Sequence, residues 1–396
     1  MIYHLLSLAL ATLLVAPLPA SCAQSPDGST ETRPNQGTLS EKWAADRGFS
    51  GIVTFAHLPH KACLATEGLG FDIAILGAPF DTATSYRPGA RFGPRAVRDA
   101  SMRLSAGGGY NTRASHNPLA SWAKIVDCGD IPVAPYDNAL AMRQITEAYV
   151  ELGKRPATRS VASGSGSRTT SNPIIVTIGG DHSISLPILR AMKEVHKTPV
   201  SVLHFDAHMD TWAPDTEAYW DTEQSRFNHG SVFWHASQEG LIDKRSSLHV
   251  GLRSRLGGED DTDYKTDDQQ GFTRIANDDI DTIGTKGIIS TINAWIGLSK
   301  PVYLSVDIDV LDPSQAPGTG TPEVGGWTSR ELIQVLRGIE GLNIVGADLV
   351  EMSPPYDSTG QVTALAASHI VYEILTSISK RGLLQAEEGD LRRNEL

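Results

Sequence analysis

The 396-residue sequence predicts an α/β fold of three layers, α/β/α, with a mostly parallel sheet of about eight strands. Eight short apolar runs rich in β-branched residues recur at 71–76, 125–126, 174–178, 200–205, 248–252, 272–275, 302–306 and 344–350. The runs are nearly continuous rather than alternating, which is typical of strands buried on both faces. Helix-like stretches separate them at 138–152, 186–196, 282–297 and 329–339. This alternation favours parallel strands joined by crossover helices.

The composition is that of a globular protein with a large core. Hydrophobic residues make up 40% of the chain and charged residues 20%, so enough apolar surface is available for burial. The net charge is −12, from 34 basic and 46 acidic residues. Because phosphate binding needs a basic face, and lysine and arginine cluster nowhere beyond a short loop, we exclude nucleic acid as a partner.

The first residues predict a secretory signal peptide, residues 1–23. Residues 5–15 are an apolar run too short to span a bilayer, and Ser21-Cys22-Ala23 supplies the small residues of a cleavage site. The segment has no lysine or arginine, and the alternative is a disordered apolar leader. The signal peptide predicts a secreted or secretory-pathway protein with no membrane contact after cleavage. Cleavage would leave Cys63 and Cys128, which permit a disulfide without requiring one.

Beyond the signal peptide we expect one domain, residues 46–385. A disordered leader rich in Ser, Pro, Gly and Thr precedes it at 24–45, and a C-terminal tail follows at 386–396. Within the domain, residues 154–173 read as a flexible insertion. The segment 212–228 is either a solvated loop or a loop that faces the substrate.

Three acidic–histidine clusters each follow an apolar run directly. They supply six candidate metal ligands, namely His182, Asp206, His208, Asp210, Asp307 and Asp309. In the second and third clusters the candidates are spaced two residues apart, and alternate residues of an extended chain point the same way. The first cluster presents its histidine after a Gly-Gly turn. Since open α/β sheets bind ligands at the carboxyl ends of their strands, we expect the three clusters to meet.

So many carboxylates in one place require cations. Four buried aspartates without counter-ions would raise one another's pKa or repel, whereas two divalent ions bring four positive charges. Oxygen-rich ligation with a minority of imidazole favours Mn²⁺, and the same residues could also hold Zn²⁺, Co²⁺ or Fe²⁺. Two adjacent cations can activate water at neutral pH, so the sequence indicates a two-metal hydrolase. Asp181 and Asp312 fit structural roles, as a capping residue and a turn former.

At these motifs the sequence resembles the ureohydrolase family, which includes arginase, agmatinase and their relatives. The resemblance is carried by Gly-Gly-Asp-His-Ser at 179–183, Asp-Ala-His-Met-Asp at 206–210 and Ser-Val-Asp-Ile-Asp-Val-Leu-Asp-Pro at 305–313. The segments 85–94 and 351–357 are similar to the agmatinase branch in particular. The likeness extends from residue 71 to residue 380 and implies an arginase-like fold.

Carried over residue by residue, the resemblance implies two Mn²⁺ ions per subunit. One would be bound by His182, Asp206, Asp210 and Asp307. The other would be bound by Asp206, His208, Asp307 and Asp309, so that Asp206 and Asp307 bridge both ions. The family commonly forms trimers or hexamers, so a homo-oligomer is expected.

The resemblance also assigns two residues to the substrate. Glu351 matches the glutamate that binds the guanidinium group, and a carboxylate can accept two parallel N–H bonds from that planar cation. His229 resembles the histidine beside the metals that contacts the substrate. Either His229 or Asp210 would then act as the catalytic acid that protonates the departing amine. The alternative for His229 is a purely structural histidine.

A small guanidine is therefore the expected substrate, with urea and a primary amine as products. Agmatine, which would yield putrescine for polyamine biosynthesis, is favoured by the flanking motifs and by the acidic loop 215–223, which could attract its second cationic end. The close alternative is 4-guanidinobutyrate, whose carboxylate would need a cation such as Arg226 or Arg253. Arginine is disfavoured because no arginase-type loop for its α-amino acid end is visible.

Two hypotheses from other classes stay open. A deacetylase-like amidohydrolase of the same fold uses one metal and would not need both His182 and the full set of aspartates. A metal-binding homologue without catalysis would be expected to lack Glu351 or a bridging aspartate, and this chain has all of them.

Overall fold

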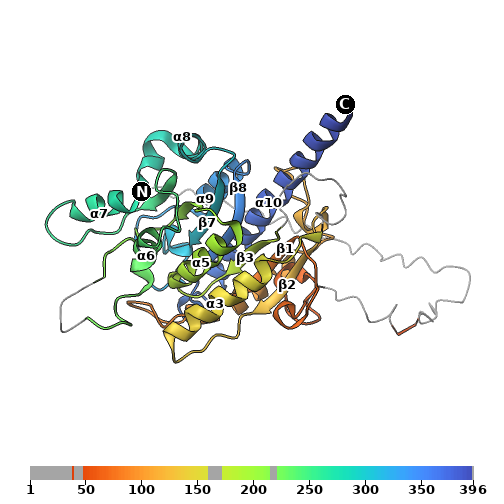
Figure 1. The fold of residues 1–396 in the computed structure, drawn as a ribbon, viewed down its shortest axis with the longest axis horizontal. Helices are drawn as coiled ribbons and strands as arrows, with labels where there is room; N and C mark the ends of the chain where they lie inside the picture. The colour runs from red at the N-terminus through yellow and green to blue at the C-terminus, as the bar shows by residue number, and fades with distance from the viewer. Residues whose placement is uncertain (1–37, 40–47, 159–171, 215–220, 395–396) are drawn as a thin grey trace, which may run out of the picture. The chain divides into compact units, whose positions relative to one another are not determined.

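The computed structural model describes residues 38–39, 48–158, 172–214 and 221–394 (Figure 1). The predicted signal peptide lies outside the described residues, and so do nearly all of the predicted leader and most of the predicted insertion. The described residues from Gly48 onward belong to one unit, and this unit carries the whole sheet.

All eight predicted strands are present, and every pairing between neighbouring strands is parallel. They are β1 (Ile73–Gly77), β2 (Ile125–Asp130), β3 (Ile174–Ile178), β4 (Ser201–Phe205), β5 (Ser247–Leu252), β6 (Phe272–Ala276), β7 (Pro301–Asp307) and β8 (Asn343–Val350). Their order in space is β2-β1-β3-β8-β7-β4-β5-β6. The chain builds one flank with β1–β3, the other with β4–β6, and then fills the centre with β7 and β8. Open α/β sheets bind ligands where the strand order reverses in this way.

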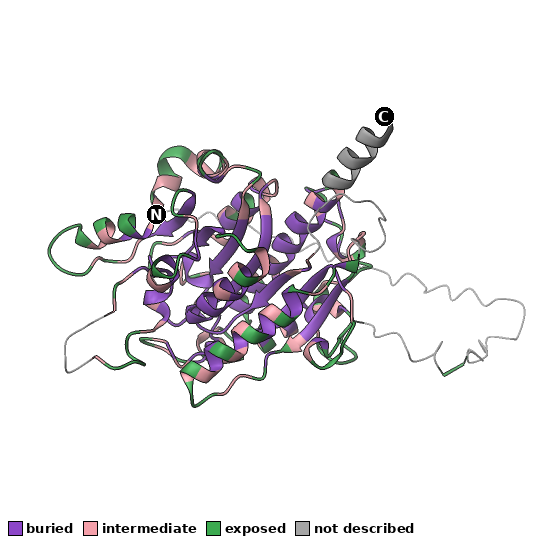
Figure 2. Ribbon diagram, viewed as in Figure 1, coloured by how far each residue is buried: buried purple, intermediate pink, exposed green. Residues whose placement is uncertain are grey.

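Both faces of the sheet are buried, which explains the continuous apolar runs in the sequence (Figure 2). In β1, Ile73 and Ile75 join one hydrophobic cluster, whereas Ala74 and Leu76 join a second cluster on the opposite face. Helices complete both clusters and form the outer layers. They are α2 (Gly93–Ala100), α8 (Asp279–Ile296), α9 (Ser329–Gly338) and α10 (Val362–Asn394) on the first cluster, and α3 (Asn138–Gly153), α5 (Ser185–His196) and α6 (Val232–Gln238) on the second. The predicted three-layer architecture is confirmed.

Side chains near the predicted helix boundaries set where the helices begin. Asp137 accepts a hydrogen bond from the backbone N–H of Leu140 at 2.9 Å and caps α3. Thr328 and Glu331 form a capping box at the start of α9. The helix predicted at 282–297 begins earlier, at Asp279, whose carboxylate accepts from the N–H of Ala276 at 2.8 Å.

The last helix, α10, belongs to the core. Among the described residues, only its segment Val362–Leu384 is long and apolar enough to cross a membrane, and 78% of its most apolar window is buried inside the fold. Burial of that extent identifies a core helix, because its apolar side chains already pack against the protein. Helical structure continues to Asn394, so the residues predicted as a C-terminal tail are helical up to that point.

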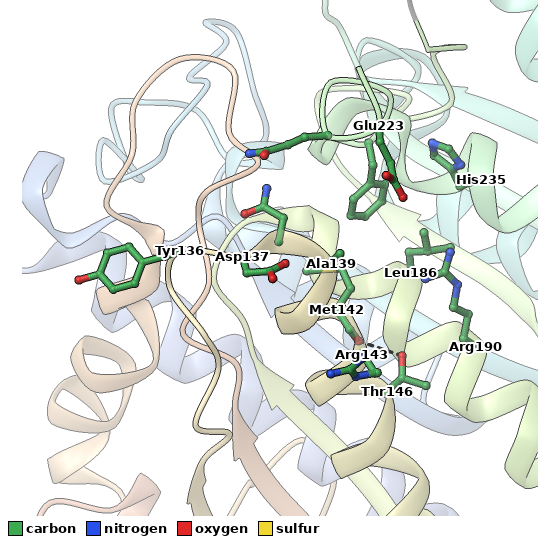
Figure 3. Close-up of a pocket in the computed structure, with 13 residues that line it drawn as sticks. Tyr136, Asp137, Ala139, Met142, Arg143, Thr146, Leu186, Arg190, Glu223 and His235 are labelled. Atoms are coloured by element: carbon green, nitrogen blue, oxygen red, sulfur yellow. Dashed lines mark hydrogen bonds between the residues drawn. The ribbon is translucent and has the colours of Figure 1, made fainter. Parts of the chain in front are cut away.

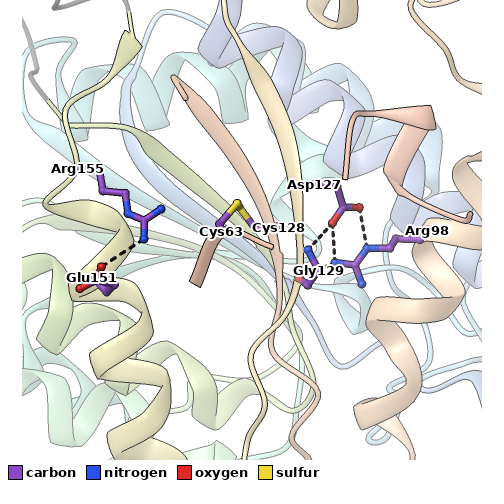
Figure 4. Close-up of a disulfide and its surroundings, with 7 residues drawn as sticks. All are labelled: Cys63, Arg98, Asp127, Cys128, Gly129, Glu151 and Arg155. Carbon is purple, nitrogen blue, oxygen red and sulfur yellow. Dashed lines mark hydrogen bonds and ion pairs between the residues drawn. A yellow bond between two sulfur atoms is a disulfide. The ribbon is translucent and has the colours of Figure 1, made fainter. Parts of the chain in front are cut away.

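A disulfide joins Cys63 to Cys128 (Figure 4), which answers the question that the sequence left open. Its Cα atoms lie 5.1 Å apart, within the usual range for such a bond. Cys63 lies in a short 3₁₀ helix (Cys63–Ala65) and Cys128 lies in β2, so the bond ties the segment before the sheet to its edge strand.

Candidate metal centre

The four central strands, β3, β8, β7 and β4, bring the predicted site residues together. The carboxyl ends of these neighbouring strands lead directly into the six candidate ligands and Glu351. Five of the six candidates are buried, and His208 is partly exposed. We call the six candidate ligands the metal centre from here on.

The turn after β3 can only be made with glycine. A Cβ atom at Gly180 would lie 1.8 Å from the carbonyl oxygen of Phe80, which is far inside van der Waals contact. Asp181 then accepts from the N–H of Ser183 at 3.1 Å and from the N–H of Ala83 at 2.9 Å. The capping role predicted for Asp181 is confirmed, and its result is to hold His182 at the end of the strand.

His182 Nδ1 faces three carboxylates. Oδ2 of Asp206 lies 3.1 Å from it, Oδ2 of Asp210 3.0 Å and Oδ2 of Asp307 3.3 Å, yet none has the angles of a hydrogen bond. On the other side of the ring, Nε2 lies 2.8 Å from Oγ of Ser305, which itself donates to Asp348. Ser305 therefore accepts from Nε2–H, so the neutral ring presents a bare Nδ1 lone pair in the centre of three oxygens.

A second group of ligand atoms lies beside the first. His208 Nδ1 is 3.2 Å from Oδ1 of Asp206 and 3.1 Å from Oδ2 of Asp309. Asp206 thus turns one oxygen towards each histidine, the arrangement that a shared ligand requires. The two groups within ligand distance are His182 with His204, Asp206 and Asp210, and His208 with Asp206 and Asp309.

The donor set fits two cations. Burial, together with Asp309 and Asp206, raises the pKa of Asp307 well above its ordinary value. Burial, together with Asp206, raises the pKa of Asp309 to about 6. The raised pKa values of Asp307 and Asp309 show that their ionised forms are disfavoured here by burial and by neighbouring carboxylates, a cost that cations would offset. The bare Nδ1 of His182 and the excess of carboxylate oxygens are both what a pair of divalent ions would occupy.

Two non-glycine residues of the site have left-handed backbones. Asp210 has a φ angle of 54° and Glu351 one of 61°. Such a conformation costs of the order of 1–2 kcal/mol for a residue with a Cβ atom. The fold holds this strain at the two positions where a side chain must turn back towards the centre, which is typical of functional sites.

Glu351 has one oxygen engaged and one free of protein partners. Oε1 accepts from the N–H of His182 at 2.8 Å and contacts His229 Nδ1 at 2.9 Å. Oε2 is buried and has no hydrogen-bond partner among the described residues. Space beside it is kept open by Gly320, where a Cβ atom would lie 3.3 Å from Oε2. A buried carboxylate oxygen left in this way is costly unless a donor arrives from outside the protein.

His229 is held between Glu351 and Ser85. Burial lowers the pKa of His229, but the Glu351 carboxylate more than compensates and raises it to about 9. An opposing contact comes from Ser85, whose N–H points at Nε2 at 3.1 Å and whose Oγ lies 2.7 Å from it. Glu351 accepts from Nδ1–H and so stabilises the protonated imidazole, whereas the Ser85 N–H favours a bare Nε2. The imidazole is thus set up to exchange its Nε2 proton.

A cavity of about 260 Å³ opens at these residues. It is lined by Ser85, His208, Asp210, Trp212, Asn228, His229, Gly230, Asp307 and Thr321. Sequence reasoning missed Ser85, Trp212 and Thr321. The available signals were that Ser85 starts one of the agmatinase-like segments, and that Trp212 comes two residues after a candidate ligand.

Neither arginine that the sequence offered as a rim cation is free. Arg226 forms a two-point ion pair with Asp221. The Arg253 guanidinium donates to the backbone carbonyls of Asp309 at 2.6 Å and Glu323 at 2.8 Å, so it braces the loop after β7. Tertiary contacts therefore engage both side chains. Of the acidic loop, Asp221 is the partner of Arg226, and Asp215 and Glu217 lie outside the described residues.

A larger cavity of about 670 Å³ lies elsewhere (Figure 3). It is bounded by the start of α3, by α5 and α6, and by the segment 223–227. It contains none of the metal-centre residues. Asp137 on its wall is the cap of α3, and Arg190 is paired with Glu239 at 2.6 Å. The chemistry of the chain is therefore concentrated at the smaller cavity.

Comparisons with known proteins find relatives that match most of the chain. The model of the arginase family matches residues 71–376. A Schizosaccharomyces pombe protein named "Putative agmatinase 1" is 46% identical over 95% of this chain and 94% of its own length. The human mitochondrial guanidino acid hydrolase is 36% identical over 92% of this chain and 98% of its own. The structure of proclavaminate amidinohydrolase from Streptomyces clavuligerus superposes with a TM-score of 0.71 at 34% identity, and covers 85% of this chain and 100% of that one.

Proposed function

Because this chain belongs to the arginase family, it is a hydrolase of C–N bonds, and we propose that it converts agmatine to urea and putrescine. The observation that carries the proposal is the buried Oε2 of Glu351, which has no hydrogen-bond partner among the described residues and lies next to the metal centre. A guanidinium group is the donor that matches such an oxygen, since its N–H bonds are planar, charged and directed.

We further propose two Mn²⁺ ions as the cofactor. His182, Asp206, Asp210 and Asp307 would hold one ion, and Asp206, His208, Asp307 and Asp309 would hold the other. When bound, such ions lower the pKa of water and stabilise negative charge on a reacting centre. Mn²⁺ is favoured over softer metals because four of the six candidate ligands are carboxylates. Elemental analysis of the protein after incubation with Mn²⁺ would test both the identity and the number of ions.

In this mechanism Glu351 binds the substrate, and His229 or Asp210 supplies the proton that the departing amine takes up. Oε1 of Glu351 is held by His182 N–H and His229, so Oε2 is presented in a fixed direction to the guanidinium. His229 Nε2 lies in the cavity wall beside Ser85, where it can give its proton to the departing amine. Asp210 lines the same cavity and is the alternative donor. The cavity of about 260 Å³ suits a small, narrow substrate.

The charge at the rim supports agmatine as the substrate. Glu323 Oε1 lies 3.6 Å from His208 Nε2 and its side chain is 39% exposed, so it offers negative charge near the mouth. Agmatine ends in an ammonium group, which this carboxylate would attract. The second candidate is 4-guanidinobutyrate. It is favoured by likeness to the human guanidino acid hydrolase and to the guanidinobutyrase of Pseudomonas aeruginosa, which is 35% identical.

The test is urea release from agmatine, 4-guanidinobutyrate, arginine and 3-guanidinopropionate by protein supplied with Mn²⁺. We expect agmatine to be hydrolysed fastest, and both Asp307→Ala and Glu351→Gln to abolish the reaction. A matched substitution at the rim, Glu323→Gln, should lower kcat/KM for agmatine severalfold and leave 4-guanidinobutyrate unaffected. No urea from any of the four, with two ions bound per chain, would refute the proposal.

We also propose that the protein enters the secretory pathway and assembles as a homo-oligomer, a trimer or a hexamer. The apolar run at 5–15 supports the first part, and so does the Cys63–Cys128 disulfide, because such bonds persist in oxidising compartments. Resemblance to the ureohydrolases supports the second part. N-terminal sequencing of the protein from its native source should begin at Gln24, and light scattering would give the mass of the assembly. A chain that begins at Met1 or a monomeric mass would refute the respective part.

A further inference from the structure

A column of hydrogen-bonded side chains runs from the metal centre towards the β6 edge of the sheet. His204 Nε2 lies 2.8 Å from Oδ2 of Asp206, and His204 Nδ1 lies 2.7 Å from His249 Nδ1. His249 Nε2 in turn lies 3.1 Å from Oδ1 of Asp267. These side chains come from β4, β5 and α7 (Thr262–Gln270), and all four residues are fully buried.

We propose that Asp267 is a positioning residue for the metal centre: acting through His249 and His204, it fixes the carboxylate of Asp206 for metal binding. The inference rests on the proposed metal centre and deepens it. Asp206 is the residue whose orientation matters most, because its two oxygens face the two different histidine groups.

His204 fits the role of a support better than that of a ligand. It lies close enough to His182, Asp206 and Asp210 to share an ion with them. Both of its nitrogens are already engaged, however, one by Asp206 and the other by His249. Oδ1 of Asp206 is held by the backbone N–H of His208 at 2.5 Å. With His204 on Oδ2, each oxygen of Asp206 has one protein donor, and its remaining lone pairs are available to cations.

The hydrogen-bond inventory explains why a carboxylate stands at the far end. An ionised carboxylate can only accept a hydrogen bond, so His249 Nε2 donates to Asp267 and His204 Nε2 donates to Asp206. Asp267 therefore fixes the orientation of the His249 ring, and through the contact between the two Nδ1 atoms it fixes the ring of His204.

Asp267 is itself fixed by groups outside the column. Thr211 donates to its Oδ1 at 2.7 Å, and Arg274 of β6 pairs with its Oδ2 at 2.5 Å. Thr211 directly follows Asp210, so Asp267 is tied to a second residue of the metal centre. His249 is also stacked on Phe272, with ring centroids 4.0 Å apart at 12°, which holds the ring plane. The column of hydrogen-bonded side chains thus extends from the metal centre to β6, and neighbouring groups restrain the orientation of its side chains.

Asp268, the next residue in the sequence, provides a matched control. Asp268 pairs with the same Arg274 at 2.7 Å, but its side chain is 59% exposed and takes no part in the column. Asp267→Asn and Asp268→Asn remove the same charge from the same helix, one inside the column and one outside. Asparagine keeps the shape of the side chain, so steric change is small in both.

The experiment measures the dissociation constant for Mn²⁺ by competition with a chelator, together with the thermal stability of the metal-free protein. We expect Asp267→Asn to weaken Mn²⁺ binding by about 10- to 100-fold, as removal of outer partners of metal ligands commonly does. Asp268→Asn should leave it unchanged. At saturating Mn²⁺, urea release by Asp267→Asn should largely recover, because the residue touches no substrate.

A second variant keeps the inference testable if Asp267→Asn does not fold. His249→Phe preserves the stacking on Phe272 and removes both nitrogens, so it should weaken Mn²⁺ binding to the same degree. The double variant should be no weaker than either single one, since both break one column. Unchanged Mn²⁺ affinity in the variant that folds would overturn the inference, and so would additive losses. Wild-type protein that binds no Mn²⁺ would overturn the proposed function as well.

Discussion

The centre of the sheet and its β1–β2 flank both carry buried charged side chains, but these are paired at the flank and incompletely paired at the centre. At the flank, Arg98 from α2 contacts Asp127 of β2 (Figure 4). It also contacts Asp130 of β2, and we call these three residues the flank cluster. Asp127 accepts from Arg98 Nε at 2.8 Å, from Phe55 N–H at 2.8 Å and from Gly129 N–H at 2.9 Å. Each oxygen there has donors, and the charges are paired.

The metal centre is the reverse case. Four aspartates lie around His182 and His208, and His182 Nδ1 has carboxylate oxygens around it without a hydrogen bond. Glu351 Oε2, close by, also has no partner among the described residues. Buried polar groups that are satisfied stabilise a fold, whereas unsatisfied ones indicate a partner from outside. The comparison therefore separates a cluster that supports structure from one that is built to bind.

The sharpest way to break this comparison is to remove a carboxylate from the metal centre. Asp307→Asn should reduce urea release by about 10³-fold or more, because catalysis by metal ions supplies several kcal/mol. The metal-free protein should stay folded, since one source of repulsion is gone. Assays at saturating Mn²⁺ and the thermal shift caused by Mn²⁺ would measure both effects. Wild-type activity in this variant would contradict the assignment.

The same substitution at the flank should have the opposite result. Asp127→Asn leaves the buried guanidinium of Arg98 with one charged partner, the half-exposed Asp130, and the backbone carbonyl of Gly129. Loss of one member of a buried pair costs about 3–5 kcal/mol, so the free energy of unfolding should fall by that amount. Denaturant titration would measure it. Activity per folded molecule should match wild type, and a specific loss of kcat would show that the flank is not purely structural.

Removing the disulfide beside the flank cluster tests whether this flank affects stability alone. The bond spans 65 residues, and loop-closure entropy for that length corresponds to about 4 kcal/mol. We expect Cys63→Ser combined with Cys128→Ser to lower the free energy of unfolding by up to that amount. Mn²⁺ affinity should not change, because neither cysteine contacts the metal centre. A change in Mn²⁺ affinity comparable with that of Asp307→Asn would run against this separation.

The smallest expected effect concerns pH and the metal-free protein. In the fold, the pKa of Asp309 is raised from 3.8 to about 6 by burial and by Asp206. Between these values the folded state binds more protons than the unfolded state, so stability falls by about 3 kcal/mol in total as pH rises from below 3.8 to above 6, and by roughly 1 kcal/mol between pH 5 and pH 8. Protein treated with chelator should therefore unfold more readily at pH 8 than at pH 5. Saturating Mn²⁺ should remove this difference, and a metal-free protein that gains stability over the same range would contradict the repulsion inferred here.

Local pattern was enough to predict the strands and the candidate ligands. The inner strands are buried on both faces, so their apolar runs are continuous and visible without knowledge of their neighbours. Asp206, His208 and Asp210 are visible in the sequence as a cluster directly after β4. The expected extended spacing was wrong, because the chain bends there and Asp210 has a left-handed φ of 54°. Asp309 likewise lies in a short 3₁₀ helix, Ile308–Val310. Parallel order then places all such strand ends at one edge of the sheet, and the predicted convergence is confirmed.

Partners far apart in sequence could not be predicted in this way. Ser85 contacts His229 across 144 residues, and Asp267 has no sequence signal that connects it with β4 or β5. The sequence shows only that Arg226 and Arg253 are cations. The fold shows that Arg226 is paired with Asp221 and that Arg253 donates to backbone carbonyls.

The sequence by itself determined the three-layer α/β fold, the family and the six candidate ligands, because short-range patterns in burial and spacing encode them. Only the tertiary structure decided which groups are satisfied and which are left open. It paired Cys63 with Cys128, supported His204 with His249, and left one oxygen of Glu351 without a protein partner. The physical reason is that a hydrogen bond or a charge pair depends on atoms brought within about 3 Å by distant parts of the chain. No local pattern records that distance.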